Sequence, residues 1–246
     1  MMERYRLYKK EYEENGFTLI KNFLNHDEVK ELKKIVDSEI EKAIKEKDSR
    51  SSHKVGDQVN SIHKINNDAR IHDFQTRNDF TELIEYLMEE ESVPFGAEIF
   101  AKPAMIGLAV PPHQDNYYWC VEPPLGMTVW IALQQSGKEN GGVYYLKKSH
   151  KNRLIAHENS GVPGSSKKII ISDELETFEK IIPELMPGDI LIHNVLVIHG
   201  SDKNNSSKGR CGLTFRYISK EHRIDSAAKN QYEIDLNEQL RSRGEI

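Results

Sequence analysis

The stretch MPGDILIHNVLVIHGSDKNNSSKGRCGLTFRYI, residues 186–218, is the most informative part of this chain for its fold. It contains two apolar, β-favourable runs, DILIHNVLVIH and CGLTFRYIS, separated by the turn-rich segment SDKNNSSKGR. Short apolar runs bounded by Gly, Asn and Ser are typical of strands joined by turns. We therefore predict two strands here, the first of which ends at His199.

Further runs of the same kind begin at about Ala97. They are AEIFAKPAMIGLAV (97–110), MTVWIALQQ (127–135) and GVYYLKKS (142–149). Because no helical segments separate these runs, they favour an antiparallel sandwich or barrel over a parallel sheet. The predicted fold class is mainly β with flanking α-helices.

The first part of the chain has a different pattern. Residues 28–47 place apolar side chains at three- and four-residue intervals, which predicts an amphipathic helix with Asn25 and Asp27 as candidate caps. A short strand at 59–65 and a helix through Leu83 and Met88 follow. We expect a single domain over residues 1–246, in which a helix-rich part of about residues 1–95 packs on a β core of about residues 96–220.

The composition excludes several classes of protein. Among 246 residues, 34 Lys and Arg face 39 Asp and Glu, and the net charge of -5 offers no basic surface for nucleic acid. No apolar run is long enough to span a membrane, and no apolar signal core follows the first residues. Two cysteines are too few for a disulfide framework. These features predict a cytoplasmic protein that binds neither nucleic acid nor membranes, and they leave its oligomeric state unknown.

A candidate metal site lies at His113 and Asp115. If the strand is extended, side chains two residues apart project to the same face, so this imidazole and carboxylate can converge. His199 is a candidate second histidine. Two histidines and one carboxylate on one face of an octahedral Fe(II) leave three positions open.

Two arginines follow on the strand after His199. A guanidinium at the edge of an apolar barrel is costly unless it meets an anion, and its planar shape suits a carboxylate. Arg210 is our first candidate for such an anion site. Arg216 has the same parity and is the second candidate, and a surface salt bridge remains the alternative for either.

Four segments together carry a resemblance to a known family, namely VPPHQDNYYW (110–119), TVWIALQ (128–134), GGVYYLKKSHK (141–151) and residues 186–218. The chain resembles the phytanoyl-CoA dioxygenase-like Fe(II)/2-oxoglutarate-dependent oxygenases over roughly residues 16–218. The resemblance implies a double-stranded β-helix, the jelly-roll or cupin-like core. It implies that iron is held by His113, Asp115 and His199, and that 2-oxoglutarate is bound by Arg210, Ser201, Trp130 and, on a looser match, Lys64.

The implied reaction uses O₂ and 2-oxoglutarate to hydroxylate a small molecule, with release of succinate and CO₂. Asp115 is present, whereas halogenases of this family have a small residue there, so hydroxylation is favoured. Two alternatives remain open. One is a cupin-type metal enzyme without 2-oxoglutarate, which would not require Arg210, and the other is a non-catalytic jelly-roll binding protein.

Candidate substrate contacts lie close to these residues in the sequence. Asn116 and Tyr118 share the parity of Asp115 and would face inward if the strand continued. Gln135 ends the run that begins at Met127. For His193, a structural role in which it hydrogen-bonds a neighbouring strand is favoured over metal binding.

Overall fold

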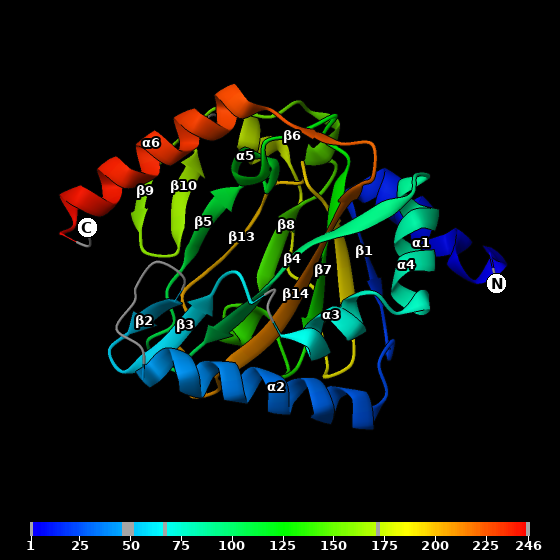
Figure 1. Cartoon of the computed structure of the whole chain (residues 1–246), viewed down its shortest axis with the longest axis horizontal. Helices are drawn as coiled ribbons and strands as arrows, with labels where there is room; N and C mark the ends of the chain where they lie inside the picture. The colour runs from blue at the N-terminus through cyan, green and yellow to red at the C-terminus, as the bar shows by residue number, and fades with distance from the viewer. Residues whose placement is uncertain (1, 46–51, 66–67, 171–172, 245–246) are drawn as a thin grey trace.

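The computed structural model describes residues 2–45, 52–65, 68–170 and 173–244 of the chain. Two antiparallel sheets form its centre, and helices lie around them (Figure 1). The predicted class, mainly β with flanking helices, is confirmed.

The larger sheet has seven strands in the order β1-β12-β7-β14-β4-β3-β2, all paired antiparallel. In chain order, these are β1 (Phe17–Ile20), β2 (Ser52–Val55), β3 (Gln58–Ile62), β4 (Ser92–Lys102), β7 (Gly126–Ala132), β12 (Ile190–Asn194) and β14 (Arg210–Ser219). The N-terminal third of the chain therefore supplies strands β1 to β3 to this sheet as well as helices.

The smaller sheet has four antiparallel strands in the order β11-β8-β13-β5. They are β5 (Val110–His113), β8 (Val143–Leu146), β11 (Lys180–Ile181) and β13 (His199–Ser201). Two further antiparallel pairs are β9 (His157–Val162) with β10 (Ser165–Ile169), and β6 (Val121–Glu122) with β15 (Arg223–Ile224). Side chains from both main sheets, including Phe17, Trp130 and Tyr145, pack in one buried cluster, so the two sheets face each other.

The prediction that the run DILIHNVLVIH forms one strand is wrong. The run divides into β12 and β13, which belong to different sheets. The chain turns at Asn194, whose backbone oxygen accepts a hydrogen bond from Val197 N (3.0 Å) and whose Oδ1 accepts one from Leu196 N (2.8 Å). After this turn the chain leaves the larger sheet and enters the smaller one at His199.

Residues of the larger sheet alternate between two environments, as the two-residue period of a strand requires. On β14, three side chains are fully buried against the main hydrophobic core, namely Leu213, Phe215 and Tyr217. The intervening side chains line a cavity between the sheets, and they include Arg210, Thr214 and Arg216.

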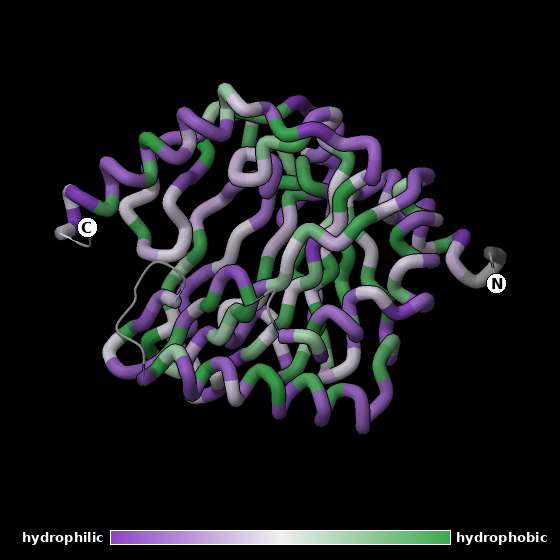
Figure 2. The backbone as a smooth tube through the Cα atoms, viewed as in Figure 1, coloured by the Kyte–Doolittle hydropathy of each residue, from purple (hydrophilic) through white to green (hydrophobic). Residues whose placement is uncertain are grey.

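The helices pack against the larger sheet or line the cavity. In chain order they are α1 (Met2–Asn15), α2 (His26–Lys45), α3 (Ala69–Gln75), α4 (Asn78–Met88), α5 (Asn116–Trp119) and α6 (Ser226–Ser242). Hydrophobic and hydrophilic residues alternate along α2 in Figure 2, and Leu32, Ile35 and Val36 are buried. None of the helices in the described ranges combines the length and apolar character needed to cross a membrane.

Two helix predictions can be compared with the structure in detail. Asn25 caps α2, because its Oδ1 accepts hydrogen bonds from the backbone nitrogens of Asp27 (2.9 Å) and Glu28 (3.1 Å). The last two residues of the predicted helix, Glu46 and Lys47, lie outside the described residues. Helix α6 was not predicted, and it packs against α5 and β9 along the top of Figure 1.

Candidate active site

The structure brings His113, Asp115 and His199 together. One ligand atom from each residue lies within 4.8 Å of the others. His113 ends β5 and His199 begins β13, and the two are direct partners in the antiparallel register of these strands. The grouping therefore follows from strand pairing, which joins residues distant in the sequence.

Asp115 reaches this group in a different way from the one predicted. Strand β5 ends at His113, and Asp115 has helical backbone angles (φ -57°, ψ -38°) as the chain enters α5. The prediction of an extended strand through Asp115 is therefore wrong. A tight turn, not strand parity, brings the carboxylate back to the histidines.

Both imidazoles are oriented by backbone carbonyls. Nδ1 of His113 donates to Pro111 O (2.9 Å), and Nδ1 of His199 donates to Val197 O (3.1 Å). The two Nε2 atoms lie 3.7 Å and 3.6 Å from Oδ1 of Asp115. Burial lowers the pKa of each histidine to about 4, and each also has a neighbouring histidine. Two neutral nitrogen lone pairs and one carboxylate oxygen thus converge, a donor set that fits Fe(II).

The second oxygen of Asp115 is held by two residues of the larger sheet. Oδ2 accepts hydrogen bonds from Thr128 Oγ1 (2.7 Å) and His193 Nε2 (3.1 Å). Thr128 and His193 are register partners on β7 and β12, so both reach the same atom. Burial would raise the pKa of the Asp115 carboxyl, but His199 and His193 lower it well below its usual range.

His193 therefore orients a metal-ligand candidate, a role that the sequence analysis did not assign to it. Its other ring nitrogen, Nδ1, lies 3.3 Å from the Tyr145 hydroxyl. The position of His193 in its strand could have indicated this role. His193 lies two residues after the inward-facing Leu191, so both side chains face the same side of the sheet.

A cavity of about 970 Å³ extends from the three candidate ligands between the sheets, and Arg210 lies in its wall. Arg210 is 3% exposed, and its Nε donates to Gly141 O (2.8 Å). Nη1 has no hydrogen-bond partner among the described residues. A buried guanidinium with a free donor in this cavity is suited to an anion such as a carboxylate.

Trp130 and Ser201 line the same cavity as Arg210. The Arg210 guanidinium lies over the Trp130 ring, 5.7 Å from its centroid. A Cβ on Gly212 would lie only 2.2 Å from this indole, so the glycine makes room for the ring. Ser201 Oγ accepts a hydrogen bond from Lys102 Nζ (2.7 Å), which leaves its own hydroxyl hydrogen available to a ligand.

Lys102 is a buried lysine that was not predicted from the sequence. Its side chain also donates to Asp202 O (2.6 Å), and its pKa falls to about 6 because of burial and the charge of Arg210. Lys102 is the register partner of Arg210 on the neighbouring strand β4. Strand parity alone could not identify that partner, because the pairing of β4 with β14 is a property of the fold.

Arg216 faces the same cavity, as its parity predicted, but in another environment. Its Nη1 lies 3.1 Å from Oε1 of Glu98, and its guanidinium lies near the rings of Phe95 and Trp119. Arg216 already has a carboxylate partner, whereas no ion pair of the described residues involves Arg210. Lys64 lies at the exposed edge of the cavity, beyond the end of β3, and not in a strand.

The three substrate candidates differ in position. Tyr118 lines the cavity, and its hydroxyl donates to Lys167 O (3.0 Å). The side-chain amide of Asn116 instead bonds both the N and the O of Val121 (3.1 Å each), which closes the turn after α5. Asn116 is not among the residues that line the cavity. It is therefore a structural residue and not a substrate contact.

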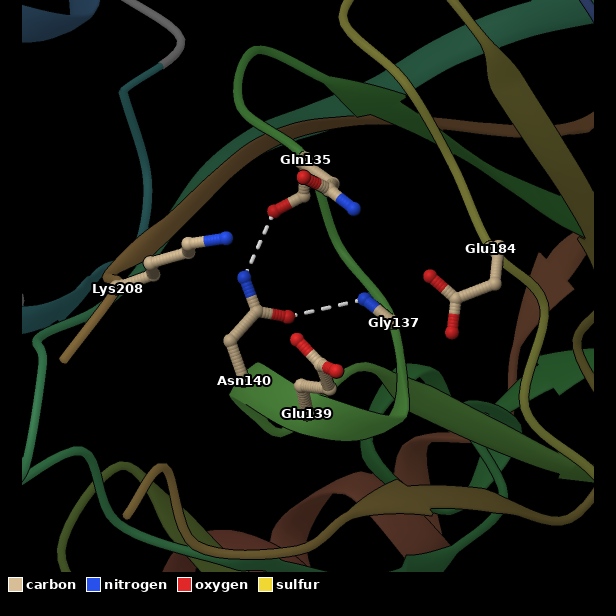
Figure 3. Close-up of a pocket in the computed structure, with 6 residues that line it drawn as sticks. All are labelled: Gln135, Gly137, Glu139, Asn140, Glu184 and Lys208. Carbon is tan, nitrogen blue, oxygen red and sulfur yellow. Dashed lines mark hydrogen bonds between the residues drawn. The ribbon is translucent and has the colours of Figure 1, made fainter. Parts of the chain in front are cut away.

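Gln135 lines a separate pocket of about 180 Å³, shown in Figure 3. Its neighbours there include Asn140, which donates to Gln135 O (2.8 Å) and accepts from Gly137 N (2.9 Å). None of the candidate metal ligands lines this pocket. The structure therefore does not bring Gln135 to the site, because the chain leaves β7 at Ala132.

Comparisons with known proteins show the family of this chain. Residues 12–212 match the family described as phytanoyl-CoA dioxygenase (PhyH). Phytanoyl-CoA dioxygenase 1 of Oryza sativa subsp. japonica is 31% identical over 134 residues, which cover 50% of this chain and 43% of the rice protein. The peroxisomal phytanoyl-CoA dioxygenase of Homo sapiens is 24% identical over 247 residues, which cover 92% of this chain and 72% of that one.

The fold is similar to that of EctD from S. alaskensis with bound Fe, with a TM-score of 0.75 at 16% identity over 89% of this chain and 78% of that one. The predicted jelly-roll core is thereby confirmed. The predicted family is also confirmed, as is the enzyme class that goes with it, an Fe(II)- and 2-oxoglutarate-dependent oxygenase that uses O₂. Because the family model matches most of its length, the chain belongs to the phytanoyl-CoA dioxygenase family.

Proposed function

We propose that this oxygenase hydroxylates a small molecule and converts 2-oxoglutarate to succinate and CO₂. The observation that carries the proposal is that three converging metal donors share one cavity with buried Arg210, whose Nη1 has no hydrogen-bond partner in the described part of the chain. An iron ion would be held by His113, Asp115 and His199, and it would supply the oxidative chemistry that protein side chains lack.

The other residues of the site would bind and orient 2-oxoglutarate. Arg210 would pair with the far carboxylate of 2-oxoglutarate, and Ser201 would donate its hydroxyl hydrogen to the same group. Lys102 holds the Ser201 oxygen, and Trp130 supports the guanidinium from one side. Because this wall of the cavity is buried, water competes little for these contacts.

Two alternatives are less well supported. A cupin-type enzyme without 2-oxoglutarate has no use for Arg210, and a buried donor without a partner would then be an uncompensated cost. A non-catalytic binding protein needs neither the oriented histidines nor the hydrogen bonds that hold Asp115. Asp115 also favours hydroxylation over halogenation.

The setting of the reaction is part of the proposal. We infer that the chain acts as one domain, because β1 to β3 are strands of the sheet that carries Arg210. A cytoplasmic, reducing location is supported by Cys120 and Cys211, which are both free and buried.

The experiment that tests the proposal measures succinate formation. Purified protein supplied with Fe(II), 2-oxoglutarate and O₂ should form succinate, and a substrate should accelerate the reaction. His199→Ala should abolish it. Succinate formation by the variant at the wild-type rate would contradict the proposal.

A further inference from the structure

A second polar cluster lies in the cavity and takes no part in holding iron or 2-oxoglutarate in the proposed function. Glu98 lines the cavity from β4, opposite Thr214 in the sheet register, with 15% of its side chain exposed. Its Oε1 accepts a hydrogen bond from His63 Nδ1 (2.9 Å) and forms an ion pair with Arg216 Nη1 (3.1 Å). Both partners therefore bind the same oxygen.

The other oxygen of Glu98, Oε2, receives no hydrogen bond from the residues that the structure describes. Burial would raise the pKa of this carboxyl, but Arg216 and His63 outweigh burial and lower it to about 2. Glu98 is thus a carboxylate at physiological pH. An ionised oxygen in a cavity needs a donor, either from water or from a ligand.

The position of Glu98 is fixed by its surroundings. A Cβ on Gly96 would lie 2.4 Å from Arg216 Nη2, so the glycine opens the space that the guanidinium fills. The guanidinium carbon of Arg216 lies 5.6 Å from the ring centroid of Phe95 and 5.7 Å from that of Trp119. A rigid partner holds the carboxylate in one orientation, as a selective binding site requires.

Glu98 also lines the cavity that contains the candidate metal ligands. Glu98, His113, Asp115 and His199 all line this cavity. A substrate that occupies this cavity beside the metal site can therefore reach Oε2. An alkyl chain at this point would remove water from the carboxylate without replacing its hydrogen bond, which disfavours binding.

We propose that Glu98 Oε2 accepts a hydrogen bond from the prime substrate, which is a small polar molecule with an O–H or N–H donor near the carbon that is oxidised. This inference rests on the proposed function, in which the substrate is the small molecule that is hydroxylated. It names Glu98 as a specificity-determining residue, with Arg216 and His63 as its positioning residues. It excludes an unbranched or branched alkyl segment at this position.

The test uses four ring-matched probes on protein loaded with Fe(II) and 2-oxoglutarate without O₂. Cyclohexylamine and cyclohexanol carry a donor, cyclohexanone carries only an acceptor, and methylcyclohexane carries neither. Ligand-observed NMR titration gives a dissociation constant for each. We expect at least one donor probe to bind about tenfold or more tighter than the ketone and methylcyclohexane, and the amine and alcohol together show whether N–H or O–H is preferred.

The decisive variant is Glu98→Gln. Its amide oxygen can still accept from His63 and Arg216, which protects folding, while its NH₂ places a donor at the position of Oε2. The preference for cyclohexylamine over cyclohexanone should therefore reverse. Glu233→Gln, which changes an exposed carboxylate of the same cavity on α6, should keep the wild-type preference.

Three results would overturn the inference. They are equal or tighter binding of methylcyclohexane or the ketone by the wild type, an unchanged preference in Glu98→Gln, and no binding of either donor probe. Iron and 2-oxoglutarate binding, measured on the same protein before the probes are added, separates this inference from the proposed function. Failure to bind iron and 2-oxoglutarate would contradict the function, whereas loss of the donor preference in a protein that binds both would contradict the inference alone.

Discussion

Along β14, the side chains that face the helices alternate with those that face the cavity. Leu213, Phe215 and Tyr217 are fully buried in an apolar core. On the other face, Arg210 and Arg216 are charged side chains that line the cavity. One strand thus contributes stability on one face and binding chemistry on the other, so substitutions one residue apart should have different kinds of effect.

The largest expected effect is the loss of iron binding by a cavity-face variant. Asp115→Ala removes one of the three candidate ligands and should reduce bound iron from about one equivalent to nearly none. Metal analysis after dialysis against Fe(II) measures this. Asp37→Asn, on the exposed surface of α2, is the control and should bind iron normally. Full iron content in Asp115→Ala would contradict the ligand assignment.

The helix-facing side should respond in stability. Leu213→Ala leaves a cavity in the apolar core and should lower the free energy of unfolding by about 2–5 kcal/mol. Thr214→Val, the adjacent cavity-facing change of similar size, should cost less than about 1.5 kcal/mol. Urea denaturation of the two variants compares the faces directly, and equal losses would show that the faces do not differ in this way.

Arg210 and Arg216 sharpen the comparison within the cavity face. Arg210→Met removes a buried cation that has no ion-pair partner among the described residues. It should weaken 2-oxoglutarate binding by about 1.5–3 kcal/mol, roughly 10- to 150-fold. Arg216→Met should have a smaller effect, because Arg216 is paired with Glu98. Calorimetric titration with 2-oxoglutarate ranks the two, and the reverse order would assign the anion site to Arg216.

A smaller effect is expected at His193, which acts through Asp115. His193→Phe removes one of the two hydrogen bonds to Oδ2, while Thr128 keeps the other. Residues that orient metal ligands typically change metal affinity 10- to 100-fold, and we expect about tenfold here. A competition titration for iron measures the change. His150→Phe is a control histidine outside the cavity, and an equal loss there would indicate a general structural effect.

A pH dependence is also expected for the stability of the metal-free protein. The folded pKa of both His113 and His199 is about 4, below the usual value of 6.5. Between these values the unfolded chain binds protons that the folded chain does not, so stability falls as the pH drops from 6.5 towards 4. Urea denaturation across this range should show a weaker fall in the double variant His113→Phe, His199→Phe than in the wild type.

The sequence predicted most of the metal and anion candidates because these residues lie in segments that together resemble a known family. His113, Asp115, His199 and Arg210 all lie at the cavity, although the turn that positions Asp115 was not foreseen. The local conformation after His113 depends on the hydrogen bond from Asn116 N to Val195 O, a contact between distant segments.

Residues whose roles depend on strand neighbours could not be predicted. His193, Lys102 and Glu98 act through partners on adjacent strands or opposite sheets, and parity does not reveal which strands are adjacent. Helix α6 was missed for another reason. Among its residues only Gln239 and Leu240 are buried, so its sequence has no apolar stripe to indicate a helix.

The most direct measurement is an anaerobic titration of the Fe(II)-loaded protein with 2-oxoglutarate, followed by visible absorption. If the cavity face of the sheets holds iron and 2-oxoglutarate together, a weak metal-to-ligand charge-transfer band should appear and saturate with one equivalent of 2-oxoglutarate. Asp115→Ala should give no band, and Arg210→Met should need a higher concentration. Iron-loaded wild-type protein that develops no band would contradict the assignment of this site.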